Sequence, residues 1–207
     1  MTSPRRTLRV KICGIARPED AVAAEAAGAD AIGLIFAERS RRFVEPDLAR
    51  RISGAVGPFL TRVGVFVDAD AGTIERTVRE AKLDAVQLHG REPDALAELL
   101  RSRVRVIRAV PFGPSTTPAA FEGRPFDAVL LDGLRPGSGE AFDWDAARAW
   151  RGHPRLALAG GLAPDTVAAA VRALRPYAVD VASGVEASPG VKDPERIAAF
   201  VRNARAT

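Results

Sequence analysis

The sequence has few of the residues that form covalent cross-links or structural metal sites. Its 207 residues include one cysteine and two histidines. A single cysteine excludes an intramolecular disulfide, and so few cysteine and histidine ligands argue against a structural metal site. The fold must therefore be stabilised by a hydrophobic core, which a chain of this length is able to form.

Long apolar runs and segregated charges are also absent. No window reaches the ~18 uninterrupted apolar residues of a membrane span, and no apolar segment follows Arg5 and Arg6, as a secretory signal would require. The 30 Lys and Arg residues are interspersed with 26 Asp and Glu residues, without a basic tail or a basic surface rich in aromatics. We therefore expect a cytoplasmic protein that binds neither membranes nor nucleic acids.

Five prolines are each followed directly by an acidic residue, which is typical of a helix start. Proline suits the first helical position, where its missing N–H would be unpaired, and an acid in the first turn complements the helix dipole. The prolines stand at positions 18, 46, 93, 164 and 194. The four separations between them correspond to one, two, three and one repeats of a unit of about 25 residues. Eight such units would fill the chain.

Eight short runs rich in β-branched residues alternate with these helical patterns. They cover residues 8–13, 31–36, 61–67, 85–89, 104–110, 128–132, 156–160 and 178–183. Strands that alternate with helices form a parallel sheet. Eight even units without a linker favour an α/β protein, a single-domain (β/α)₈ barrel over residues 1–207, with an open doubly wound sheet as the alternative. Residues 1–7 have no place in the pattern, and the segment 110–126 shows the least regular helix.

Side chains alternate along a strand, so each predicted strand has an outward row beneath the helices and an inward row facing the barrel axis. The outward row should be apolar; its candidates are Val10, Ile12, Val63, Val65, Val67, Val86, Leu88, Val129, Leu131, Leu156, Leu158, Val179 and Val181. The inward row then carries Lys11, Cys13, Gln87, His89, Asp132 and Asp180. Structural barrel interiors use Val, Ile and Leu, because burying polar groups costs several kcal/mol unless they are paired.

Three of these inward residues end their strands, at the rim where barrel enzymes carry their active sites. They are Cys13, His89 and Asp132. Each also has a structural explanation: a lone cysteine is usually a small buried hydrophobe, a histidine can be simply hydrogen-bonded, and an aspartate can cap a turn. Lys11 and Asp180 can likewise neutralise each other as a buried ion pair. The position of all three at one rim favours a catalytic function.

Two glycine-containing loops predict a phosphate site. "LAGGLAPDTV" follows the seventh strand and "VASGVEASPG" the eighth, and their small residues are Gly160, Gly161, Ser183 and Gly184. Barrels commonly bind phosphate between these loops and a short extra helix, for which "GVEAS" is the candidate.

After the second strand, the run of Arg39, Arg41 and Arg42 is either a solvated loop or the source of an arginine that binds a carboxylate.

The motifs resemble those of the phosphoribosylanthranilate isomerase family of tryptophan biosynthesis. They are "VKICGI", "GADAIGLIF", "SRRFV", "VGVFV", "AVQLHG", "LLDG", "GSGEAFDW", "LAGGLAPDTV" and "DVASGVEASPGVKD", in this order from about Leu8 onwards. The resemblance implies an aldose–ketose isomerase that acts on a phosphosugar without metal or cofactor. The reaction is the Amadori rearrangement of N-(5'-phosphoribosyl)anthranilate to 1-(2-carboxyphenylamino)-1-deoxyribulose 5-phosphate. The oligomeric state stays open between monomer and homodimer.

Residue by residue, the resemblance implies Cys13 as general base and Asp132 as general acid. It also implies Arg42 as the binder of the anthranilate carboxylate, with Gly160–Gly161 and Ser183–Gly184 around the phosphate. His89 and Asp180 are expected to support substrate binding. We further expect Lys11, two residues before Cys13 on the same strand face, to lower the pKa of the thiol. The chain departs from many relatives at Ala182, where they have serine, and in a shorter loop after the sixth strand.

Three other functions remain open. A related isomerase of histidine biosynthesis acts on a similar aminoaldose, but it has an aspartate where this chain has Cys13. A lyase would form a Schiff base through Lys11, which borohydride and substrate would trap. A noncatalytic barrel that binds phosphosugars would tolerate replacement of Cys13 and Asp132.

Overall fold

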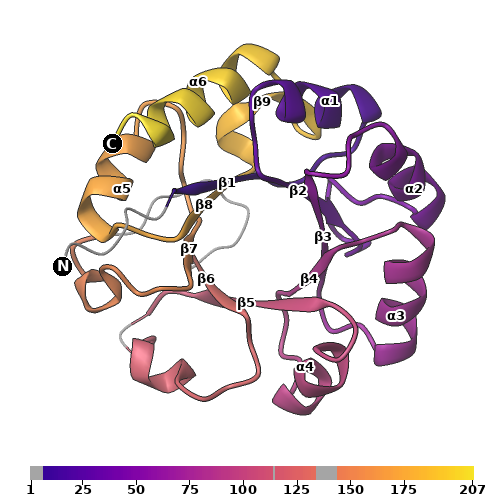
Figure 1. The fold of residues 1–207 in the computed structure, drawn as a ribbon, viewed down its shortest axis with the longest axis horizontal. Helices are drawn as coiled ribbons and strands as arrows, with labels where there is room; N and C mark the ends of the chain where they lie inside the picture. The colour runs from indigo at the N-terminus through magenta and orange to yellow at the C-terminus, as the bar shows by residue number, and fades with distance from the viewer. Residues whose placement is uncertain (1–6, 114, 134–143) are drawn as a thin grey trace.

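The computed structural model describes residues 7–113, 115–133 and 144–207. Eight parallel strands close into a barrel in chain order, with β8 hydrogen-bonded to β1. The strands are β1 (Arg9–Ile12), β2 (Ala31–Ile35), β3 (Thr61–Phe66), β4 (Ala85–Leu88), β5 (Arg105–Pro111), β6 (Ala128–Asp132), β7 (Leu156–Leu158) and β8 (Ala178–Val181). Figure 1 looks along the barrel, with the strands inside the ring of helices. The predicted closed barrel, rather than an open sheet, is confirmed.

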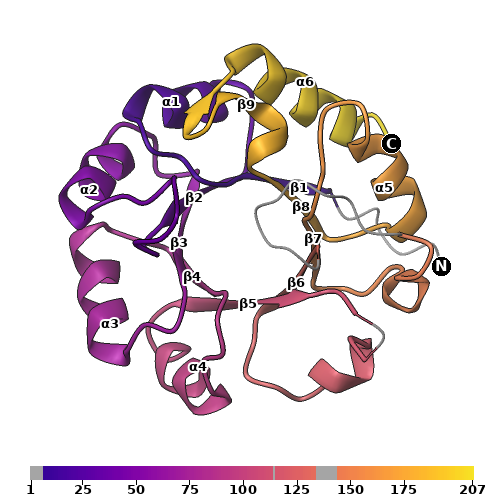
Figure 2. The same ribbon diagram turned by 180° about the vertical axis from the view of Figure 1, so that it is seen from behind.

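The outer layer contains six α-helices within the described residues. They are α1 (Pro18–Ala26), α2 (Pro46–Gly54), α3 (Ala71–Glu80), α4 (Asp94–Leu100), α5 (Val167–Leu174) and α6 (Pro194–Arg205). Helices α1, α2 and α6 begin at the predicted prolines, and Pro93 is the N-cap of α4. Helix α6 lies beside α1 and so closes the ring of helices (Figures 1 and 2). None of these helices has the length and apolar character needed to cross a bilayer.

The predicted helical pattern is not followed in two of the eight units. Among the described residues of the fifth and sixth units, the helices are short 3₁₀ helices, η1 (Pro118–Phe121) and η2 (Arg148–Trp150). The frequent proline and glycine residues of segment 110–126 disfavour an α-helix there. The fully buried Trp150 fills the outer layer instead, and its indole N–H donates to the Thr116 carbonyl at 2.8 Å. The prediction for Pro164 was also wrong, since α5 begins three residues later, at Val167.

The inward and outward rows are as predicted for most strands but reversed in β3. Val63 and Val65 line the barrel interior, and Val65 stands in register with the inward Gln87. The outward positions of β3 are Gly64 and Phe66, and the ring of Phe66 packs in the main hydrophobic core. Valine is apolar enough for either side, so its identity alone does not assign the row.

Aspartates at the amino end of the barrel join the strands in pairs. One aspartate stands directly before each of β2, β4 and β6: Asp30, Asp84 and Asp127. Each accepts a hydrogen bond from a backbone N–H of the preceding strand, at 2.8–2.9 Å; the donors are Val10, Arg62 and Val106. These N–H groups lie at the start of β1, β3 and β5, where a strand end leaves donors without ladder partners. The charged residues of this end therefore have structural partners, whereas the polar residues of the other end converge on a cavity.

Candidate active site

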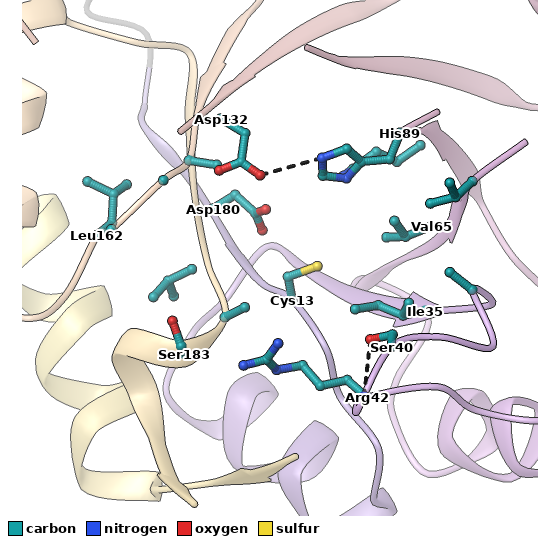
Figure 3. A pocket seen from close by; sticks show the side chains of 18 residues that line it. Cys13, Ile35, Ser40, Arg42, Val65, His89, Asp132, Leu162, Asp180 and Ser183 are labelled. Atoms are coloured by element: carbon teal, nitrogen blue, oxygen red, sulfur yellow. Dashed lines mark hydrogen bonds and ion pairs between the residues drawn. The ribbon is translucent and has the colours of Figure 1, made fainter. Parts of the chain in front are cut away.

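A cavity of about 370 Å³ opens at the carboxyl ends of the barrel strands. Of the residues predicted for the site, Cys13, Arg42, His89, Asp132, Gly160, Gly161, Asp180 and Ser183 line it. Figure 3 shows Cys13, His89 and Asp132 facing this one cavity from different strands. A larger cavity of about 690 Å³ lies at the amino end. Three of its four aspartates are the strand-pairing residues described above, and the fourth, Asp180, is paired with Lys11, so the smaller cavity is the better candidate for chemistry.

Lys11 and Asp180 form a buried ion pair behind Cys13. Lys11 Nζ lies 2.9 Å from Asp180 Oδ1, and both side chains are about nine-tenths buried. The backbone of β2 leaves room for these groups because residue 33 is glycine: a Cβ there would lie 2.6 Å from Cys13 Sγ and 3.1 Å from Lys11 Nζ. The structural explanation of Lys11 and Asp180 is thus confirmed, and the pair also borders the thiol.

The electrostatics of Cys13 differ from the expectation. Burial raises the pKa of the Cys13 thiol and the Asp180 carboxylate raises it further, while Lys11 offsets part of this increase. Lys11 thus lowers the pKa of the thiol as expected, but burial and Asp180 outweigh it, so the pKa of Cys13 is raised overall. Burial opposes the charge of Lys11, but Asp180 more than compensates and raises its pKa, so Lys11 is held as an ammonium group. An ammonium nitrogen has no free electron pair, which argues against the Schiff-base lyase.

Asp132 lies opposite Cys13 and is oriented by two neighbours. Its Oδ1 accepts a hydrogen bond from the Gly133 N–H at 2.8 Å, and its Oδ2 lies 3.4 Å from His89 Nε2. His89 Nδ1 lies 3.2 Å from the side-chain amide nitrogen of Gln87. Gln87 therefore contacts the ring nitrogen of His89 that faces away from Asp132.

The loops after β7 and β8 meet beside Asp132. Gly160 and Gly161 have φ values of +77° and +66°, which favour glycine. A Cβ on Gly160 would lie 2.5 Å from the backbone nitrogen of Gly133, so the loop passes close to β6. Gly184 does not line the cavity; it packs against the carbonyl of Leu162, where a Cβ would not fit. It therefore joins the two loops.

The prediction of a helix at "GVEAS" was wrong. The 3₁₀ helix η3 covers Ser183–Val185, and Glu186–Ser188 is a strand, β9, paired antiparallel with β10 (Val191–Lys192). Val185 is fully buried, which fixes the short turn against the barrel. Glu186 consequently points back towards the cavity, where it meets Arg42.

Of the three arginines after β2, Arg42 is the one that lines the cavity. Its side chain runs beneath Cys13 and against Gly14, whose φ of +70° and missing Cβ make room for it (Figure 3). Nε and Nη2 of Arg42 donate to the two oxygens of Glu186 at 2.6 and 2.8 Å. Lys192, whose side chain is fully buried, binds the same carboxylate at 3.0 Å.

Sequence reasoning missed Glu186 and Lys192. Both stand in the stretch "GVEASPGVKD", but neither belongs to one of the eight barrel strands, whose alternation identified the other polar residues. Charged residues in a loop are usually solvated, so their burial is visible only in the structure. The described residues hold no cluster of three or more His, Cys, Asp or Glu side chains that could bind a metal ion. The predicted loop after the sixth strand lies mostly outside the described residues.

Comparison with known proteins identifies the family. Residues 10–203 match the family model described as N-(5'phosphoribosyl)anthranilate (PRA) isomerase. The N-(5'-phosphoribosyl)anthranilate isomerase of Citrifermentans bemidjiense is 47% identical over 201 residues, which cover 95% of this chain and 97% of the relative. The crystal structure of phosphoribosyl anthranilate isomerase from Thermus thermophilus superposes with a TM-score of 0.89 at 47% identity, over 96% of this chain and 99% of that chain.

A second solved relative contains a ligand. This phosphoribosyl anthranilate isomerase is in complex with reduced 1-(o-carboxyphenylamino)-1-deoxyribulose 5-phosphate, and it superposes with a TM-score of 0.86 at 42% identity, over 97% of this chain and 100% of that chain. The family model spans nearly the whole chain, and the relatives match over nearly their full lengths. The chain therefore belongs to the N-(5'-phosphoribosyl)anthranilate isomerase family.

Proposed function

We propose that this protein isomerises N-(5'-phosphoribosyl)anthranilate to 1-(2-carboxyphenylamino)-1-deoxyribulose 5-phosphate in tryptophan biosynthesis. The observation that carries the proposal is the placement of Cys13 and Asp132 on facing sides of one cavity, beside the loops after β7 and β8 (Figure 3). Family membership supplies the substrate, and the relative with the reduced product bound supports a phosphosugar ligand at this site.

Asp132 acts as the general acid in this proposal. It donates a proton to the ring oxygen of the ribose, the C1'–oxygen bond breaks, and the nitrogen lone pair forms a Schiff base. The resulting positive charge acidifies the proton on C2'. His89, oriented by Gln87, lies against the acid and helps to bind the sugar. General acid–base catalysis of this kind contributes roughly 10²–10⁴-fold per group.

Cys13 then removes the C2' proton as a thiolate, and the electrons of the C–H bond neutralise the Schiff base to give an enol-amine. Proton transfer from the 2'-hydroxyl to C1' yields the ketose, and proton exchange with solvent returns Cys13 to the thiolate and Asp132 to the acid. Lys11 stabilises the thiolate, since it lowers the pKa of Cys13 more than Lys192, the other cation that acts on the thiol. Asp180 keeps Lys11 charged and buried, which makes it a supporting residue of the sugar site.

The substrate's two anionic ends have separate binding sites in this proposal. Gly160, Gly161 and Ser183 offer backbone N–H groups to the phosphate, and Gly184 holds the two loops together. Arg42 binds the anthranilate carboxylate on the other side of Cys13. We place the enzyme in the cytoplasm, as fits a biosynthetic step, and as a monomer or homodimer; one relative, from Thermotoga maritima, is described as monomers generated from a dimeric enzyme.

The test is turnover of N-(5'-phosphoribosyl)anthranilate by the wild type and by Cys13→Ala and Asp132→Ala. Loss of fluorescence of the anthranilate substrate follows the reaction, and circular dichroism checks the fold. Each substitution should lower kcat by about 10²-fold or more, because each removes one proton-transfer group. Folded variants that keep wild-type turnover would show that the barrel binds phosphosugars without using these residues. No turnover by the wild type would refute the function itself.

A further inference from the structure

Two buried charged residues beside the cavity have no task in the reaction described above. They are Glu186, on β9, and Lys192, on β10. We propose that Glu186 is a positioning residue that holds Arg42 side-on, so that the end of its guanidinium faces the carboxylate of the substrate, and that Lys192 balances the charge of Glu186. The proposal rests on the proposed function, since it concerns the ligand of Arg42.

The hydrogen-bond pattern of Arg42 leaves one edge of the guanidinium available. A guanidinium has five N–H donors, and the pair with Glu186 uses the side made by Nε and Nη2. Nη1 has no hydrogen-bond partner within residues 7–113, 115–133 and 144–207. The end-on edge made by Nη1 and Nη2 can therefore bind a second carboxylate in a bidentate geometry. Gly14 leaves room for the stem of Arg42, and the two hydrogen bonds to Glu186 orient its head group.

Glu186 is itself fixed from several sides. Lys192 Nζ donates to its Oε1 at 3.0 Å, and the Gly190 N–H approaches the same oxygen at 3.3 Å. Burial raises the pKa of Glu186, but the bonds from Arg42 and Lys192 outweigh this and lower it, so the carboxylate stays charged. A carboxylate held this way keeps Arg42 in one orientation.

Lys192 connects the Glu186 carboxylate to the loop proposed for phosphate binding. Its Nζ also donates to the carbonyl oxygen of Ala182 at 2.9 Å, directly before Ser183 in the loop after β8. One buried ammonium group thus joins the backbone proposed for phosphate binding to the carboxylate that orients Arg42. The span between the two proposed anion sites is then set by the fold.

The charge balance gives Lys192 a second effect. Arg42 and Glu186 alone form a neutral pair, which attracts a further carboxylate weakly. With Lys192 the cluster contains two cations and one anion, so one positive charge remains for the substrate. Burial strengthens the attraction between these charges, but it also lowers the pKa of Lys192, which Glu186 offsets only in part.

The alternative is that the cluster only stabilises the β9–β10 hairpin. A structural role would change stability and would affect all ligands of the cavity to a similar extent. A positioning role affects only ligands that carry the carboxylate. The two explanations therefore predict different ligand selectivity.

The experiment compares two probes by calorimetry: reduced 1-(2-carboxyphenylamino)-1-deoxyribulose 5-phosphate and its phenylamino analogue without the carboxyl group. Glu186→Gln keeps the shape of the side chain but turns a donor towards the cations, so Arg42 loses its fork. We expect the Kd of the carboxylated probe to rise about tenfold, or 1.4 kcal/mol, while the Kd of the analogue changes less than about twofold. The KM of the substrate should rise in parallel, with a much smaller change in kcat.

Three further variants complete the test. Asp127→Asn makes the same chemical change in an ion pair with Arg105 at the opposite end of the barrel and should leave both Kd values unchanged. In an Arg42→Ala background, Glu186→Gln should have no further effect on the carboxylated probe. Lys192→Met should weaken the carboxylated probe more than the analogue, and equal weakening would refute its role in the charge balance.

The outcomes separate the two proposals. If wild type neither binds the carboxylated probe nor turns over the substrate, the proposed function fails. If wild type does both, but Glu186→Gln binds the carboxylated probe as tightly as wild type, or more tightly, or loses both probes equally, the positioning role fails. Tighter binding would mean that Glu186 competes with the substrate for Arg42.

Discussion

Replacing Gly33 by alanine should impair catalysis without removing any functional group. Gly33 lies in the middle of β2, and a Cβ at this position would stand 2.6 Å from Cys13 Sγ, against an ordinary minimum of 3.4 Å. The same Cβ would lie 3.1 Å from Lys11 Nζ, so it has no free space there either. The thiol therefore has to move by about 0.8 Å or more if the barrel keeps its shape.

A displacement of this size has a predictable cost. Misplacing a reacting group by about 1 Å lowers rates by about 10²-fold, which corresponds to ~2.7 kcal/mol of transition-state stabilisation. Inserting a methyl group into a packed interior costs about 1–3 kcal/mol of unfolding free energy. We expect Gly33→Ala to fold, with reduced stability in urea titration, and to have a kcat/KM about 10²-fold below that of wild type.

The matched control is Gly54→Ala. Gly54 is the last residue of α2, and a Cβ there would meet no atom within 4 Å. Stability should be equal or slightly higher, because alanine is the better helix residue, and kcat/KM should be unchanged. A folded Gly33→Ala enzyme with wild-type kcat/KM would refute the reasoning, since it would mean that the position of the Cys13 sulfur does not limit the reaction.

Two other predictions concern pH and the outer layer. Burial and Asp180 raise the pKa of Cys13, and a base acts only when it is deprotonated. We therefore expect kcat/KM to rise with pH beyond neutrality and to decline as the pH falls. A flat profile between about pH 6 and 9 would argue against a thiolate base. Trp150→Ala removes a fully buried side chain and the donor to the Thr116 carbonyl. The free energy of unfolding, measured by urea titration, should therefore fall by about 3–5 kcal/mol. A loss below about 1 kcal/mol would contradict the packing described around Trp150.

Much of the barrel was predictable because its sequence signals are local. The β-branched runs predicted every end of the eight strands to within two residues. The proline–acid pairs predicted the starts of α1, α2 and α6. The short 3₁₀ helices that the described residues of the fifth and sixth units form were not predictable from the same signals, because a 25-residue repeat counts chain length rather than helical content. Trp150 closes that sector through contacts distant in sequence.

The candidate site was predictable where a strand's alternation determines the direction of a side chain. Asp132 is the last residue of β6, and Cys13 and His89 directly follow β1 and β4. Parallel strands in a barrel direct their ends to one rim. Glu186 and Lys192 were not predictable in this way, because their burial depends on the β9–β10 hairpin folding back onto Arg42. The overall direction of the pKa shift at Cys13 was not predictable either, since the sequence shows a neighbouring lysine but not the depth at which both are buried.

The site depends on missing side chains as much as on those that are present. Gly14 leaves room for the stem of Arg42, Gly33 for the sulfur of Cys13, and Gly160 for the backbone next to Asp132. At each position a methyl group would displace a group that the proposed mechanism uses, whereas Gly54, on the outer face, has free space. The glycines around the rim therefore carry functional information that a search for reactive side chains overlooks, because they determine where the thiol, the guanidinium and the carboxyl group are able to lie.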